Sequence, residues 1–326
     1  PVPREWTIEE SWAQESKMRF KNAFKILVTK FSLTWHVLIY YLFITIIIAS
    51  IGAAVLIPFF ETYKAMGLGQ EFNKIIITLF QSNSFEEVSV QFKGLYIRII
   101  DEFLAVPRVG WSLRIFLLGI IGVLARLLYG FCELSIVSVL EGHMSANAQY
   151  SFSGAYLSNL GKSIKFQFFK MLFTLPYDIF IVFSLYLMTY LFKVPGLALF
   201  APVLIMGVLI LLVAFRLTAM SHWGASIIVD NNGVFKGLVQ GLKLVFKRKN
   251  FLSILSSFIV LVIIAIALNI FITFFTLGAG LFLTVPLTIL WCNCINMTSY
   301  YMATGKRFYV DSDTIYTSPV SIDKDE

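Results

Sequence analysis

The chain has 326 residues, of which 58% are apolar and only 14% are charged, and its mean hydropathy is +0.80. Soluble domains usually carry about a quarter charged residues, so this composition excludes a soluble enzyme, a disordered chain and a disulfide scaffold. The net charge of +7 does not indicate nucleic-acid binding, because the basic residues adjoin apolar segments and form no patch with interleaved aromatic residues. We expect them to contact anionic lipids of a cytoplasmic leaflet.

Six apolar stretches are long enough to cross a membrane. A hydrocarbon core of about 30 Å requires about 20 helical residues, because every backbone group must be hydrogen-bonded within the segment. The predicted spans are residues 34–60, 112–140, 171–192, 197–222, 251–275 and 281–302. The first begins too far along the chain and is too long for a cleaved signal peptide. We therefore expect an all-α, polytopic membrane protein with a single membrane domain over 1–326.

The distribution of basic residues predicts the orientation. With the N-terminus inside, the cytoplasmic segments hold 17 Lys and Arg residues and the outer segments hold 6. The cytoplasmic segments are 1–33, 143–170, 223–250 and 303–326, and the outer ones are 61–111 and 193–196. Basic residues in short loops are retained on the cytoplasmic side, so both termini are expected in the cytoplasm. The polar tail that begins after residue 307 is expected to be mobile or held by a partner.

A basic amphipathic stretch precedes the spans at three places. Apolar residues recur at helical spacing in 157–168 and again in 235–246, with lysines on the opposite face, and a shorter copy aligns at 20–28. We interpret the chain as three repeats, each an interfacial amphipathic helix followed by two spans. Residues 151–153 and 230–233 carry the N-cap chemistry that would start the second and third of these helices. Convergence among juxtamembrane helices is the alternative explanation.

The segment Ile227-Ile228-Val229-Asp230-Asn231-Asn232-Gly233-Val234-Phe235-Lys236-Gly237-Leu238 leads into a basic run and another pair of spans. It resembles a set of bacterial six-span membrane proteins, including the membrane domain fused to some glycerophosphodiester phosphodiesterases. The resemblance covers at most residues 143–302 and includes no catalytic motif. It implies a fold family and a bacterial cytoplasmic (cell) membrane, and it implies no activity.

The outer segment 61–111 is far longer than the other outer turns. Apolar residues keep helical spacing between 88 and 103, and residues 71–81 fit a second, short amphipathic helix. Two interpretations remain open for this segment. It is either an outer cap that closes a cavity or docks a protein partner, or a pair of helices that rests on the outer membrane surface.

Ionisable residues within spans are costly and are therefore the first candidates for a site. Glu133, Asp178 and Arg216 are each predicted about six or seven residues from the cytoplasmic end of a span, and Arg126 lies two helical turns before Glu133. Pairing of Arg216 with one carboxylate would leave the other as a proton or cation site. A purely architectural ion pair is the alternative.

The last span adds Asn293 and Asn296, one turn apart, which we interpret as interhelical hydrogen-bonding groups or as further members of the polar site. The three histidines and three cysteines match no metal-ligand spacing, so neither a metal nor a cofactor is expected. Walker, Gly-x-Gly-x-x-Gly and Gly-x-Ser-x-Gly motifs are absent from the sequence, and we expect no enzymatic activity.

Two functions fit these features. The first is a transport or lipid-handling carrier with a polar cavity in the inner leaflet. The second is a non-catalytic subunit or assembly factor of a larger membrane complex, which would bind protein partners through residues 61–111 and the tail at 303–326.

Overall fold

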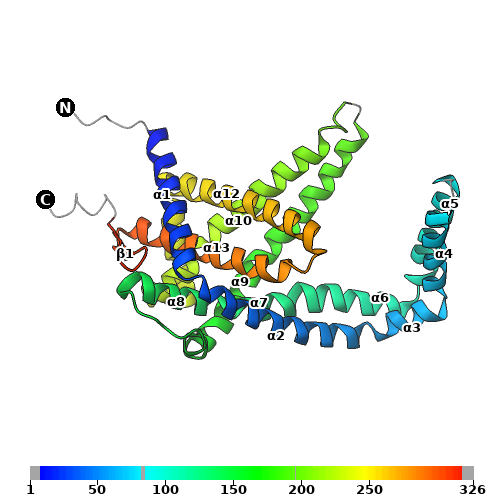
Figure 1. Ribbon diagram of the computed structural model, residues 1–326, viewed down its shortest axis with the longest axis horizontal. Coiled ribbons are helices and arrows are strands. Elements are labelled where there is room, and N and C mark those ends of the chain that lie inside the picture. The colour runs from blue at the N-terminus through cyan, green and yellow to red at the C-terminus, as the bar shows by residue number, and fades with distance from the viewer. Residues whose placement is uncertain (1–7, 82–84, 195, 318–326) are drawn as a thin grey trace. The chain divides into compact units, whose positions relative to one another are not determined.

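The computed structural model describes residues 8–81, 85–194 and 196–317, which form helices and one short β-hairpin (Figure 1). Six helical stretches among these residues are long and apolar enough to cross a membrane, which confirms a multi-pass, predominantly helical protein. They are Ser32–Val55, Pro107–Ala146, Phe152–Lys193, Ala201–Val229, Asn250–Thr276 and Leu281–Thr304. Each predicted span overlaps one of them.

The chain divides into two compact units, which are described separately. The main unit comprises Pro1–Leu42 and Gly130–Glu326, and the second unit comprises Phe43–Tyr129. The helices of the main unit are α1 (Ile8–Thr29), α8 (Glu133–Ala146), α9 (Phe152–Met188) with the 3₁₀ turn η3 (Thr189–Lys193), α10 (Ala201–Val229), α11 (Val234–Val245), α12 (Arg248–Thr276) and α13 (Leu281–Thr304). Two helices cross the boundaries between the units, namely α2 (Ser32–Val55) and α7 (Arg126–Gly130).

The core of the main unit lies where α1 packs against α12 and α13, and where α10 and α8 contact α13 (Figure 1). Ile26, Leu140, Phe258 and Tyr300 are fully buried there. Side chains this enclosed make many close contacts, and such van der Waals packing holds helices together in lipid, where the hydrophobic effect does not drive their association. The face of α1 that packs against these helices therefore contains Ala23 and Ile26, whereas Phe24 and Val28, which belong to the predicted apolar face, remain exposed.

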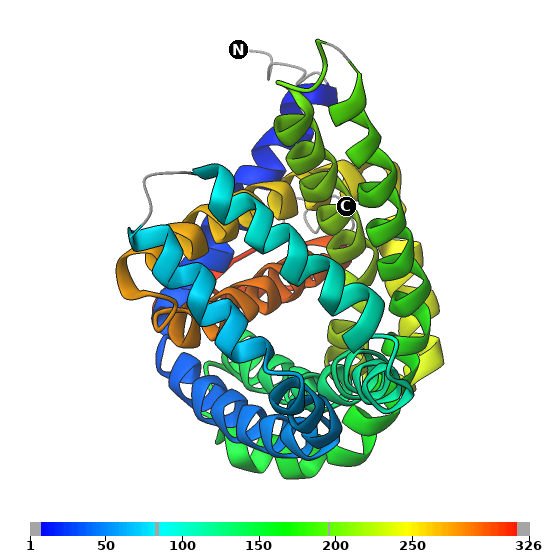
Figure 2. The same cartoon turned by 90° about the vertical axis from the view of Figure 1, so that its right-hand side faces the viewer.

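The second amphipathic stretch does not form a separate helix. It is continuous with the following span in α9, a 37-residue helix that contains Pro176, so the predicted boundary at residue 171 is wrong. No helix-breaking residue occurs in 165–175, which explains the continuity. The predicted start is confirmed, because the Ser151 hydroxyl accepts a hydrogen bond from the backbone N–H of Gly154 at 3.4 Å. Figure 2 shows α9 running beside α10.

The third amphipathic stretch, α11, is a separate helix that packs closely on α10. Gly237 and Gly241 face α10, and a Cβ atom on Gly241 would lie 3.1 Å from the backbone of His222 and Trp223. Small residues four apart allow two helix backbones to approach closely. The Trp223 indole also donates to the carbonyl of Val234 at 2.8 Å.

The first part of the tail folds against the main unit. Strands β1 (Phe308–Tyr309) and β2 (Ile315–Tyr316) form an antiparallel hairpin, and β1 packs against α8. Phe308 is buried between Tyr301 and Tyr316. An aromatic anchor in an otherwise polar tail is the sequence signal for this ordered segment. Residues 318–326 lie outside the described part of the chain.

The second unit contains α3 (Ile57–Ala65), α4 (Leu68–Gln81), α5 (Phe85–Arg98), the π-helical η1 (Ile99–Phe103), α6 (Pro107–Arg114) and the π-helical η2 (Ile115–Ala125). The two amphipathic helices predicted in the outer segment are confirmed as α4 and α5, which lie side by side (Figures 1 and 2). Ion pairs of Arg98 with Glu71 and Glu102 fasten α5 to α4 and to η1.

Candidate functional site

Four polar residues of α9 form a stripe along one face of the span. Gln167, Lys170, Thr174 and Asp178 occur at intervals of three, four and four residues, which keeps them on the same side of a helix. Gln167 and Thr174 are buried, and the other two residues form ion pairs with neighbouring helices. We call these four residues the α9 polar stripe.

At one end of the stripe, Lys170 pairs with Glu133 of α8. Its Nζ lies 2.5 Å from both carboxylate oxygens, and Gln167 donates a further hydrogen bond to Glu133 at 2.9 Å. The ammonium also lies 5.4 Å from the ring centroid of Phe166, within cation–π distance. Gly130 provides space for the Gln167 amide, because a Cβ atom there would overlap it.

At the other end, Asp178 pairs with Arg216 of α10. The distance between Nε and Oδ1 is 2.8 Å, and Nη2 lies 3.3 Å from Oδ2, so the guanidinium meets the carboxylate side by side. The expected pairing of Arg216 with one of the two carboxylates is therefore realised with Asp178. The expectation that the other carboxylate remains unpaired is wrong, because Glu133 is neutralised by Lys170.

Both ion pairs are mostly covered by protein but keep part of each side chain exposed. The side chain of Lys170 is 23% exposed and that of Arg216 is 30% exposed, while each carboxylate is 19% exposed. Lys170 and Asp178 are eight residues apart on α9, so the two pairs lie about two helical turns from each other along this helix. Helix α9 thus connects the two ion pairs, because it supplies Asp178 to one and Lys170 to the other. The sequence alone assigns Lys170 to a cytoplasmic segment.

The remaining candidates behave differently. Asn293 is buried and donates to the Ile289 carbonyl of its own helix at 2.9 Å, so this amide nitrogen does not make the expected interhelical bond. The side-chain oxygens of Asn293 and Asn296 have no hydrogen-bond partner among the described residues. Arg126 belongs to the second unit and is not placed relative to Glu133.

A second polar cluster surrounds Asp230, directly after α10. Its carboxylate accepts hydrogen bonds from Lys306 at 2.6 Å, from Gln240 at 2.7 Å and from the Tyr300 hydroxyl, and Asn232 donates to Gln240 at 2.6 Å. Burial alone would raise the pKa of Asp230, but these donors together hold it below its usual range. The Asp-Asn-Asn-Gly segment therefore ties α10, α11 and α13 together.

Sequence reasoning missed Lys170 and Gln167. Their spacing from Asp178 places both residues on the same helical face, which is a signal that the sequence contains. It is not recognised because the predicted span begins at residue 171, after both of them. Among the described residues, no group of three or more His, Cys, Asp or Glu side chains is arranged to hold a metal.

Comparison with protein-family models, with curated proteins and with solved structures finds no match.

Proposed function

We propose that this multi-pass membrane protein handles anionic lipids or a similar anionic solute at the α9 polar stripe. The observation that carries the proposal is the partial exposure of Lys170 and Arg216 within apolar helices. A charge facing hydrocarbon is costly, so their exposed parts must meet water or lipid headgroups rather than acyl chains.

The chemistry of these two cations suits a phosphate. A guanidinium has five N–H donors and binds phosphate in a bidentate manner, and an ammonium binds it as a compact charge. Asp178 and Glu133 accept hydrogen bonds from only some of the N–H donors of Arg216 and Lys170. Each carboxylate can therefore hold its cation in place while the cation also accepts an anionic headgroup.

Purified protein in vesicles that contain a fluorescent anionic phospholipid tests this function. We expect the wild-type protein to retain the lipid in native mass spectrometry and to speed its movement between leaflets, measured by dithionite bleaching. The variants Lys170→Gln and Arg216→Gln should lose several-fold in both measurements, whereas Lys165→Gln, a change at an exposed lysine of the same helix, should not. Wild-type vesicles with neither retention nor movement would contradict the proposal.

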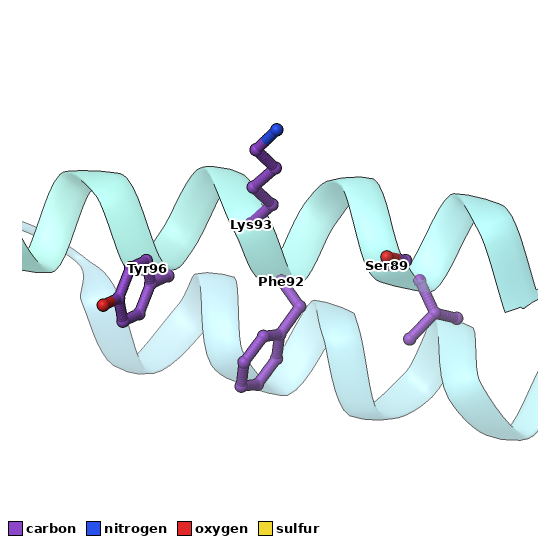
Figure 3. A pocket seen from close by; sticks show the side chains of 5 residues that line it. Ser89, Phe92, Lys93 and Tyr96 are labelled. Atoms are coloured by element: carbon purple, nitrogen blue, oxygen red, sulfur yellow. The ribbon is translucent and has the colours of Figure 1, made fainter. Parts of the chain in front are cut away.

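A second candidate, a subunit or assembly factor, is supported by the second unit. Phe92, Tyr96, Val88, Ser89 and Lys93 line an open cavity of about 440 Å³ on α5. Figure 3 shows Phe92 and Lys93 on opposite sides of the helix. Exposed apolar side chains beside polar ones are common where another chain docks. A stoichiometric partner chain in native mass spectrometry of gently extracted protein would favour this candidate.

A further inference from the structure

The guanidinium of Arg19 on α1 is buried in the main unit without a matching carboxylate. Arg19 as a whole is only 1% exposed, and its Nη1 donates a hydrogen bond to the Ser253 hydroxyl of α12 at 2.9 Å. Among the residues that the structure describes, Nε has no hydrogen-bond partner and no carboxylate lies within ion-pair distance of the guanidinium. Glu15, one turn earlier, acts on Arg19 only through space. A buried charge left like this is strongly unfavourable unless something compensates it.

Arg19 remains charged at neutral pH. Burial lowers its pKa to about 10, with a smaller opposing effect from Glu15. This value still lies well above 7, so a full positive charge persists inside the helix cluster. Compensation therefore has to come from an anion or from oriented dipoles rather than from loss of the proton.

A second buried group interacts electrostatically with this charge. His222 of α10 is fully buried, neither of its ring nitrogens has a hydrogen-bond partner among the described residues, and it lies within electrostatic range of Arg19. A neutral imidazole always carries one N–H donor. The ring is held edge-on against Tyr300, with a centroid distance of 5.5 Å, so its orientation is restrained by packing.

Hydroxyl groups complete the surroundings. The Tyr316 hydroxyl of β2 is buried without a partner among the described residues and lies within electrostatic range of Arg19. Ser16 of α1 lies 3.1 Å from Ser257 and accepts from Ser256 at 2.8 Å, which joins α1 to α12 beside the guanidinium. Guanidinium, imidazole and hydroxyl groups all supply donors to an anion.

We propose that Arg19, His222, Ser253 and Tyr316 form an internal binding site for a small inorganic anion, either chloride or phosphate. The bound anion neutralises Arg19 and accepts hydrogen bonds that the protein leaves unmade. The site uses none of the residues of the α9 polar stripe and does not depend on the proposed lipid function. Enclosure of Arg19 favours an anion of a few atoms over a lipid headgroup.

Thermal unfolding of the full chain in detergent tests the site. The midpoint is measured in sodium gluconate with increasing sodium chloride, and separately with increasing sodium phosphate, at constant ionic strength and pH 7. We expect one of the two anions to raise the wild-type midpoint saturably by about 5 °C, because a ligand that binds the folded state alone stabilises it. The saturating anion identifies the ligand.

The variant Arg19→Gln should lose this response, while Lys21→Gln, a change at an exposed position of the same helix, should keep it. If Arg19→Gln fails to fold, Tyr316→Phe and Ser253→Ala remove one hydroxyl each and should require a several-fold higher anion concentration for the same shift. Equal wild-type midpoints in all three salts would overturn the proposal, as would an undiminished response in Arg19→Gln or in both hydroxyl variants.

Discussion

Lys170 Nζ on α9 lies 2.5 Å from each carboxylate oxygen of Glu133 on α8. Because both side chains are mostly covered by protein, removal of one partner leaves the other charge without compensation. We expect Lys170→Met to destabilise the protein by about 3 kcal/mol, observed as a lower midpoint of thermal unfolding in detergent.

The double variant Lys170→Met with Glu133→Leu serves as the control for this pair. Replacement of both ions by apolar side chains of similar size often costs little, because neither charge then remains buried alone. The double variant should regain most of the stability that the single variant loses. A double variant as unstable as Lys170→Met would show that packing, and not the ion pair, determines the effect.

The sequence is sufficient to predict six spans, because long apolar runs have few alternatives in lipid. It also locates α4 and α5 through their amphipathic spacing. Sequence periodicity does not show that α9 continues through residue 171, since an amphipathic helix and a span share the same 3.6-residue period. The sequence therefore cannot predict that Glu133 pairs with Lys170, because tertiary packing selects this residue from several nearby cations.

The pairing of Asp178 with Arg216 is among the predicted alternatives, because opposite charges at similar depth in adjacent spans attract strongly in a medium of low dielectric constant. By contrast, the buried position of Arg19 cannot be inferred from the sequence. Its stretch has the pattern of an interfacial helix with basic residues toward headgroups, and only the contact of α1 with α12 and α13 reveals that one arginine points inward.

A side chain at Gly241 should destabilise the packing of α11 on α10. A Cβ atom at this position would lie 3.1 Å from the backbone of α10, and backbone atoms cannot move aside as a flexible side chain can. We expect Gly241→Val to cost about 1 to 3 kcal/mol through overpacking between α10 and α11. Gly207→Val is the matched control, since a Cβ atom there meets nothing within 4 Å. Equal losses in the two variants would show that the close approach of α11 to α10 is not the cause, since helix propensity favours valine over glycine at both positions.

Asp230 should make stability depend on acid pH. Its folded-state pKa lies below the ordinary value of 3.8, so its contribution is present above that value and is lost as the pH falls through the folded-state pKa. Asp230→Asn should lower stability by about 2 kcal/mol at pH 7 and flatten the fall of the unfolding midpoint below about pH 4. The exposed Asp313→Asn should behave like wild type at pH 7. An unchanged acid profile in Asp230→Asn would contradict this role.

The predicted membrane orientation of the chain can be tested by labelling single cysteines. In a background with Cys132, Cys292 and Cys294 replaced by alanine, the variants Gln81→Cys on α4 and Lys165→Cys on α9 each place one thiol at an exposed position. The excess of basic residues puts residue 165 inside and residue 81 outside. A membrane-impermeant maleimide should therefore label only the Gln81→Cys variant in intact cells, and both variants after the membrane is permeabilised. Labelling of Lys165→Cys alone in intact cells would invert the topology and place the basic stretches on the outer face, where the anionic leaflet could not be their partner.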